Sequence, residues 1–241
     1  MAQLETSWHG APPSYLSLGL PEIHRHLPGP GLPCGALHEV QAAAHGDTPA
    51  SFGFTLALMA GALQARRGPA VLVVSRQAAD FGQPYGHGLQ SFGLDVARLL
   101  LVRTRAGKDA LWAVEETLRS ASGAAVVAGV VERDLDLTMS RRLNLAAATA
   151  GTPLLLLRPP TATATSAATT RWRIAAAPAS RDRFDAFAHW RWQVALERCR
   201  NGRPGHWTLE WDHVAYRLHL AEVVADRAPA AGARQAIRRV V

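Results

Sequence analysis

A strand–loop–helix pattern spans residues 39–61, and its loop is the first place in the chain where phosphate chemistry could occur. A phosphate-binding loop of the Walker A type needs glycines for close backbone approach, a lysine that reaches the β- and γ-phosphates, and a Ser or Thr hydroxyl for Mg²⁺. The loop residues here are Gly46, Asp47, Thr48, Pro49, Ala50 and Ser51. A carboxylate therefore stands where an anion should bind, and a proline removes a backbone donor. We interpret this loop as a vestigial cofactor-binding site.

The chain contains one lysine, Lys108, and it does not restore the motif elsewhere. It lies in the segment RTRAGKDAL, where Val102 replaces the leading glycine of the loop and Asp109 replaces the Ser or Thr. This segment is therefore interpreted as a loop that enters a helix.

Two further positions needed for ATP hydrolysis also lack the required side chains. The apolar run that should end in a Mg²⁺-ordering aspartate has Gly129 and Val130 near its end. Glu132 and Asp134 follow this run, and the alternative is that one of them replaces the missing aspartate. Gln77 stands where a general base should be, and an amide can orient water but cannot accept its proton. We predict that the protein is not an enzyme and that it needs neither a cofactor nor a metal.

Five short apolar runs alternate with segments of helical period, which is the pattern of a parallel sheet with crossover helices. The expected strands are residues 37–40, 70–75, 98–103, 124–131 and 152–158. The expected helices are residues 50–66, 79–92, 108–121 and 136–150. The sequence thus predicts an α/β fold with a mostly parallel central sheet and flanking helices.

The pattern changes after the fifth run. Residues 161–170 form an Ala/Thr-rich segment of low complexity that is expected to be a surface loop. A short strand is expected over residues 171–176. The segments 192–200 and 206–212 then flank the turn sequence NGRPG, which predicts a C-terminal antiparallel hairpin.

Arginine and tryptophan alternate at Arg171, Trp172 and Arg173. Aromatic stacking combined with positive charge is how proteins hold single-stranded nucleic acid, so these residues are candidate nucleic-acid contacts. The alternative is that Trp172 is an anchor of the core or of an interface. Direct DNA contact has weak support, because the preceding loop is uncharged.

Composition and charge indicate a globular protein with a basic end. The chain has 241 residues, of which 48% are hydrophobic, and a net charge of +7. Residues 171–241 carry 13 arginines against seven acidic residues. No apolar run approaches the length of a membrane span and no signal peptide is evident, so a cytoplasmic location without membrane association is expected.

We divide the chain into three parts. Residues 1–28 are expected to be an extended, proline-rich lead-in that covers one edge of the sheet, and residues 29–221 the core. Residues 222–241 are expected to be a flexible basic tail. The tail arginines Arg234, Arg238 and Arg239 are candidate partner contacts.

Four segments together resemble one family. They are GPGLPCGALHEV (29–40), GDTPASFGFTLAL (46–58), SRRLNLAAATAGTPLLLLRP (140–159) and RCRNGRPGHWTLEWD (198–212). They are similar to the ImuA family, the RecA-like, SulA-related accessory proteins of bacterial translesion DNA synthesis. The resemblance implies a RecA-like core of the P-loop-NTPase type with a degenerate nucleotide site. It also implies induction by DNA damage (the SOS response) and a Y-family-like polymerase partner of the ImuB type. RecA would be a further partner, and an error-prone replicative-type polymerase an indirect one.

The hairpin sequence RCRNGRPG adds a specific similarity. It resembles the Lys-x-Arg-Asn-Gly hairpin by which RecA-superfamily helicases reach the ATP site of a neighbouring subunit. Arg198 and Arg200 fall on the two basic positions, where a guanidinium neutralises phosphate charge in trans. The alternative is that these arginines simply solvate a hairpin.

The sequence leaves two other function classes open. One is a nucleotide-binding or DNA-dependent RecA-like ATPase with unorthodox contacts. The other is a SulA-like inhibitor of cell division. The sequence favours a non-catalytic accessory protein over both, because the catalytic side chains are absent and because the long basic C-terminal third has no role in a SulA-like protein.

Overall fold

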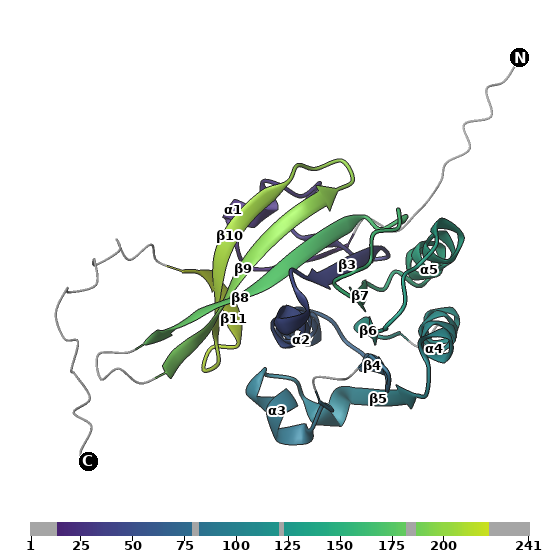
Figure 1. The fold of residues 1–241 in the computed structure, drawn as a ribbon, viewed down its shortest axis with the longest axis horizontal. Coiled ribbons are helices and arrows are strands. Elements are labelled where there is room, and N and C mark those ends of the chain that lie inside the picture. Colours follow the sequence, from purple (N-terminus) through teal and green to yellow (C-terminus); the bar gives the residue numbers. More distant parts are fainter. Residues whose placement is uncertain (1–13, 79–81, 121–122, 182–186, 222–241) are drawn as a thin grey trace, which may run out of the picture.

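A nine-stranded sheet organises the computed structural model, which describes residues 14–78, 82–120, 123–181 and 187–221 (Figure 1). Its strand order is β11-β10-β9-β8-β3-β7-β6-β4-β5. The strands are β3 (Leu37–Ala42), β4 (Ala70–Ser75), β5 (Leu99–Thr104), β6 (Val126–Val130), β7 (Leu154–Arg158), β8 (Thr170–Arg181), β9 (Phe187–Cys199), β10 (Gly205–Asp212) and β11 (Arg217–Leu220). The run from β8 to β5 is parallel, and β9, β10 and β11 extend it antiparallel.

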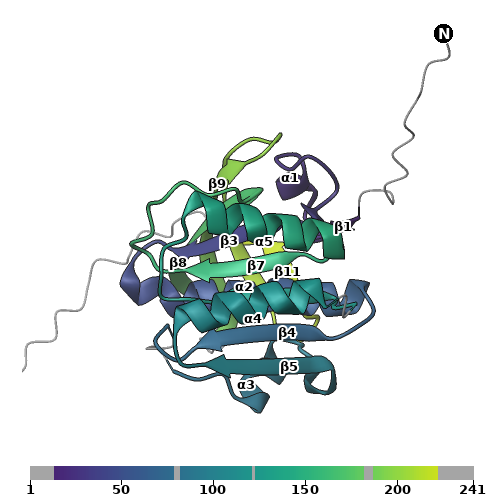
Figure 2. The same ribbon diagram turned by 90° about the vertical axis from the view of Figure 1, so that its right-hand side faces the viewer.

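Helices cover both faces of the parallel part. They are α2 (Thr48–Ala65), α3 (Gly86–Ser91), α4 (Gly107–Arg119) and α5 (Leu137–Ala150). The short α1 (Pro21–His24) lies apart from them, beside β10 (Figure 1). Short 3₁₀ turns lie at His45–Asp47 and Val96–Arg98. Helices α2 and α3 lie on one face, while α4 and α5 lie side by side on the other (Figures 1 and 2). Each face has its own apolar core, because alternate residues of a buried strand point to opposite sides.

The predicted α/β sheet is confirmed, and each of the five expected strands is present. The predicted helix 79–92 is shorter than expected, since α3 begins only at Gly86. Pro84 disfavours helical geometry in the residue before it, and Gly86 and Gly88 are poor helix formers. Residues 79–81 lie outside the described part of the chain. The predicted hairpin is also present, with β9 paired to β10.

Two C-terminal predictions need correction. The strand expected over residues 171–176 extends from Thr170 to Arg181, and β11 was not predicted at all. The segment 161–170 is irregular as expected, but it is not simply a surface loop, because Ala162, Ser166 and Ala168 are buried.

Helix α2 is enclosed on almost all sides. Every residue from Ser51 to Ala60 is buried. The antiparallel strands curl round the helix, so that Phe54 contacts Trp172 and Trp192 at ring-centroid distances of 6.0 Å each (Figure 1). A helix that is apolar all round is expected in such a position.

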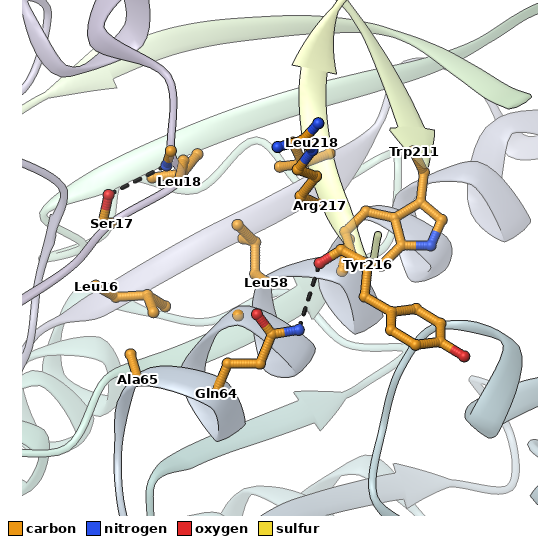
Figure 3. A pocket seen from close by; sticks show the side chains of 13 residues that line it. Leu16, Ser17, Leu18, Leu58, Gln64, Ala65, Trp211, Tyr216, Arg217 and Leu218 are labelled. Atoms are coloured by element: carbon orange, nitrogen blue, oxygen red, sulfur yellow. Dashed lines mark hydrogen bonds between the residues drawn. The ribbon is translucent and has the colours of Figure 1, made fainter. Parts of the chain in front are cut away.

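The described part of the lead-in, residues 14–28, also belongs to this core. Its strand β1 (Tyr15–Leu16) pairs antiparallel with β2 (Leu32–Pro33). Leu16, Leu18 and Ile23 are buried in the same cluster as α2. The lead-in thus packs against α2, and a pocket of about 330 Å³ remains between it, α2 and the β10–β11 turn (Figure 3).

Candidate functional site

A small cleft lies where the carboxyl ends of β3, β4, β6 and β7 meet. This edge of a parallel sheet is where α/β proteins commonly bind ligands. The cleft is lined by His45, Thr48, Gln77, Glu132 and Arg158, among others. The structure therefore brings the loop after β3 together with Gln77 and Glu132, the candidate positions for base and metal chemistry. Its volume is about 100 Å³, well below the roughly 300–1,000 Å³ typical of small-molecule pockets.

Asp47 occupies the loop with its own negative charge. Its Oδ2 accepts a hydrogen bond from the Ala44 N–H at 3.1 Å, and its Oδ1 accepts one from the Ala176 N–H in β8 at 2.9 Å. In a phosphate-binding loop, backbone N–H groups such as that of Ala44 point at the ligand. Here the Asp47 carboxylate accepts the Ala44 N–H and also joins the loop to the neighbouring strand.

Other polar groups of the loop are likewise bonded within the protein. The Ala43 N–H donates to the Ile174 carbonyl oxygen at 2.8 Å. The Thr48 hydroxyl donates to the His45 carbonyl at 2.7 Å, and the Ser51 hydroxyl donates to the Thr48 carbonyl at 2.8 Å. Ser51 is also fully buried. Both hydroxyls therefore serve the start of α2.

Glu132 lies at the end of β6 and binds a helix start. Its Oε1 accepts the Gly107 N–H, the first of α4, at 2.6 Å. Burial raises the pKa of Glu132. The neighbouring Ser75 side chain, the Glu132 and Gly107 N–H groups and the charge of Arg133 together outweigh burial and hold this pKa below its usual value. A carboxylate at the N-terminus of a helix is stabilised by the exposed N–H groups there, so the charge of Glu132 has a structural partner.

Asp134, the other candidate for the missing aspartate, belongs to a charged network under the β7–β8 loop. It pairs with Arg158, and its Oδ2 accepts the N–H groups of Thr163 and Ala164 at 3.1 and 3.0 Å. Arg158 also donates to Glu39 Oε1 at 2.7 Å, with both side chains 1% exposed. Burial lowers the pKa of Arg158, and the charge of Glu39 opposes that shift.

Arg171 completes the same network by donating to Glu39 Oε2 at 3.0 Å. Of the other candidate nucleic-acid residues, Arg173 pairs with Glu197, and Trp172 is fully buried with its indole N–H on Thr170 Oγ1 at 2.8 Å. The indole thus offers no ring face to a base in this structure. The prediction of DNA contact stays with the two arginines and is untested.

The hairpin arginines lie near the amino ends of the parallel strands, whereas the loop follows the carboxyl end of β3. Arg198 and Arg200 are exposed beside the β9–β10 turn, whose Cys199 lies next to Thr170, the first residue of β8. Arg198 Nη1 donates to the Ser166 carbonyl at 2.8 Å. These side chains therefore lie away from the chain's own loop, which follows the carboxyl end of β3.

The lead-in fixes the hairpin turn. His26 Nδ1 lies 2.7 Å from the Pro204 carbonyl, and the His26 carbonyl accepts the Arg203 N–H at 3.0 Å. Gly202 is required here because a Cβ at this position would lie 2.3 Å from the His26 carbonyl oxygen. The tail residues Arg234, Arg238 and Arg239 lie outside the described residues.

Comparison with known proteins identifies the family. The chain is 38% identical over 230 residues to "Protein ImuA" of Caulobacter vibrioides strain NA1000 / CB15N, an alignment that covers 90% of this chain and 91% of that protein. The chain belongs to the ImuA family. The same values hold for "Protein ImuA" of the C. vibrioides strain ATCC 19089 / CIP 103742 / CB 15. No model in the scanned collection of protein families matches the chain.

Sequence reasoning missed Glu39 and Arg158 as parts of this site. A signal for both was present, since each is a charged residue in a run that was expected to be a buried strand, and buried charges are found in pairs. Their partnership was not visible, because 119 positions separate them.

Within the described residues, no helix is long and apolar enough to cross a membrane.

Proposed function

We propose that this ImuA-family protein is a non-catalytic accessory protein of damage-induced translesion DNA synthesis. It has a RecA-like core that retains the strand–loop–helix unit of a nucleotide site without the chemistry. The observation that carries the proposal is the double hydrogen bond of Asp47, which places a carboxylate on a backbone N–H of the loop and joins the loop to β8. A triphosphate bound there would meet this negative charge at close range.

Two features of the cleft support the same proposal. The chain's only lysine, Lys108, is the second residue of α4 and is not among the residues that line the cleft. The carboxylates that could hold Mg²⁺ are already bonded, Glu132 to the start of α4 and Asp134 to Arg158 and the β7–β8 loop. The cleft thus works as a junction of the fold in which each of these charged groups has a protein partner.

Membership of the ImuA family supports three proposed partners. We propose that the protein binds a Y-family-like polymerase partner of the ImuB type and RecA, and acts on an error-prone replicative-type polymerase indirectly. The exposed Arg198 and Arg200 are suited to the nucleotide site of an active RecA-like neighbour, because they lie near the amino ends of the parallel strands, away from the chain's own loop.

The first experiment tests nucleotide independence. The purified protein is titrated with a fluorescent ATP analogue and Mg²⁺, with RecA as the positive control, and its complex with the Y-family-like partner is measured with and without ATP. We expect no saturable binding up to millimolar analogue and a complex that is unchanged by ATP. Micromolar binding, or a complex that forms only with ATP, would favour the alternative of a nucleotide-dependent regulator.

The second experiment tests the hairpin. The double variant Arg198→Ala/Arg200→Ala is compared with Arg203→Ala, an exposed arginine in the same turn. We expect the double variant to lose binding to RecA or to the polymerase partner, while Arg203→Ala retains it. If the double variant binds both partners as tightly as the wild type, the docking role of this hairpin is excluded.

A further inference from the structure

The outer face formed by α4 and α5 exposes two large apolar side chains. Trp112 on α4 is 66% exposed and Leu145 on α5 is 68% exposed. The inner sides of these helices are filled by buried residues such as Leu111, Val114 and Leu143. The two residues stand on adjacent helices, and tryptophan is enriched among the residues that dominate binding energy in interfaces.

A groove of about 290 Å³ runs between these helices, next to Leu145. Its walls include Leu118, Arg119, Arg142, Leu145, Ala146 and Ala150. Figure 2 shows that α4 and α5 run side by side along the sheet, and residues of both helices line the groove. An apolar groove is the shape into which an amphipathic helix lays its apolar face.

The charges at the rim favour a negatively charged occupant. Arg119 and Arg142 both bind the buried carboxylate of Glu115, each at 2.7 Å, and their side chains remain 58% and 51% exposed. One buried carboxylate thus holds two guanidinium groups at the groove and neutralises only one of them. Exposed Arg141 on α5 adds a cation, against exposed Glu116 on α4.

We propose that the α4–α5 groove binds an acidic amphipathic helix of another protein. Leucine- or phenylalanine-sized side chains of that helix enter the groove beside Leu145 and pack on Trp112. Its flanking carboxylates pair with Arg119 and Arg142. This is the helix-in-groove mode, in which anchors recur at positions i, i+3, i+4 and i+7. The inference goes beyond the proposed function and does not depend on the state of the nucleotide cleft.

Charge and shape favour this occupant over two others. The basic C-terminal segment, residues 222–241, carries four arginines against two acidic residues, and like charges at the rim disfavour it. Nucleic acid needs cations repeated along a phosphate backbone. Here two arginines, Arg119 and Arg142, line an otherwise mostly apolar groove, and both share the carboxylate of Glu115.

The test uses a displayed library of helical peptides about 14 residues long, or four turns. Leu or Phe is fixed at positions i, i+3, i+4 and i+7, and the flanking positions vary among Glu, Lys and Ser. Selection on the full-length protein should enrich Glu beside the apolar anchors. Enrichment of Lys or Ser, or no binder at all, overturns the proposal.

The most enriched peptide is then labelled and titrated by fluorescence anisotropy. Leu145→Glu and Trp112→Glu should each weaken binding about tenfold or more, because each places a carboxylate where an apolar anchor packs. The matched control is Val214→Glu, an apolar residue that is 78% exposed in the β10–β11 turn, and it should leave affinity unchanged. Equal affinity for all three variants and the wild type overturns the proposal.

A charge variant tests the role of the rim. Arg119→Ala leaves Arg142 on Glu115, so the buried carboxylate keeps a partner. This change should weaken the Glu-flanked peptide by about three- to fivefold, as expected for a partly exposed charge pair, and should barely affect its Gln-flanked form. Competition by a single-stranded oligonucleotide would assign the groove to nucleic acid. Sedimentation of the wild type as a dimer that Leu145→Glu dissociates would assign it to a second copy. Either result overturns the proposal.

Discussion

Removing the charge of Glu39 should destabilise the fold strongly, because this carboxylate lies between two arginines with no exposure to water. Glu39 accepts from Arg158 at 2.7 Å and from Arg171 at 3.0 Å, and both Glu39 and Arg158 are 1% exposed. Breaking a buried ion pair by removing one partner typically costs about 3–5 kcal/mol. In Glu39→Gln the amide still accepts one hydrogen bond and Asp134 still pairs with Arg158, so we expect a loss near the lower end, about 3 kcal/mol.

The assay is denaturant and thermal unfolding followed by circular dichroism. A loss of about 3 kcal/mol corresponds to a fall in Tm of about 9 °C for a chain of this size. The matched control is Glu197→Gln, which removes the carboxylate that binds Arg173 where both side chains are about one-third exposed, and it should cost less than about 1 kcal/mol. In a double-mutant cycle with Arg158→Met, the two changes should cost at least about 1 kcal/mol less together than the sum of the single variants. Equal losses for Glu39→Gln and Glu197→Gln would refute the reasoning.

Three further predictions concern single residues. Burial lowers the pKa of His38 to about 4. The unfolded chain, with a His pKa of about 6.5, therefore binds the proton more tightly, and the free energy of unfolding should fall by up to about 3 kcal/mol as the pH drops from 6.5 to 4. In His38→Gln the urea midpoint of unfolding should depend less on pH across that range. A pH dependence equal to that of the wild type would contradict the pKa shift of His38. Asp47→Ala should lose about 1–2 kcal/mol of unfolding free energy in the same assay, because two backbone N–H groups lose a partly exposed charged acceptor. A loss below about 0.3 kcal/mol would mean that the carboxylate does not hold the loop. Gly202→Ala should cost about 2 kcal/mol through its clash with the His26 carbonyl, while Gly86→Ala, with no atom within 4 Å of the new Cβ, should be nearly neutral; similar unfolding midpoints for both would exclude the clash.

The sequence was sufficient for the parallel half of the fold. The apolar runs at residues 37–40, 70–75, 98–103, 124–131 and 152–158 became β3 to β7 with boundaries shifted by at most two residues. Helix α5 ends at Gly151, as its sequence indicated, because this glycine adopts the left-handed conformation with a φ of 62°. These elements are encoded locally, by periodicity and by end signals, and local signals can be read without knowing the neighbours.

The antiparallel half was harder to predict. Residues 171–181 alternate weakly, and β11 is only four residues long. Their conformation depends on pairing with other strands and on packing round α2. The same packing explains why Trp172, a candidate nucleic-acid contact by sequence, is buried beside Phe54. An arginine–tryptophan alternation in a strand places the two residue types on opposite faces, and only the fold determines which face is covered.

For the candidate site, the sequence alone determined which residue types are present, namely no lysine in the loop, Gly129 and Val130 near the end of β6, and Gln77 after β4. Chemistry of that kind depends on residue types, which the sequence states directly. Only the tertiary structure determined what the remaining charges do. It placed Asp47 on the backbone of its own loop and of β8, Glu132 on the start of α4, and Glu39 against Arg158. These pairings join segments far apart in the chain, and they form because a buried charge is stable only when the fold brings it a partner.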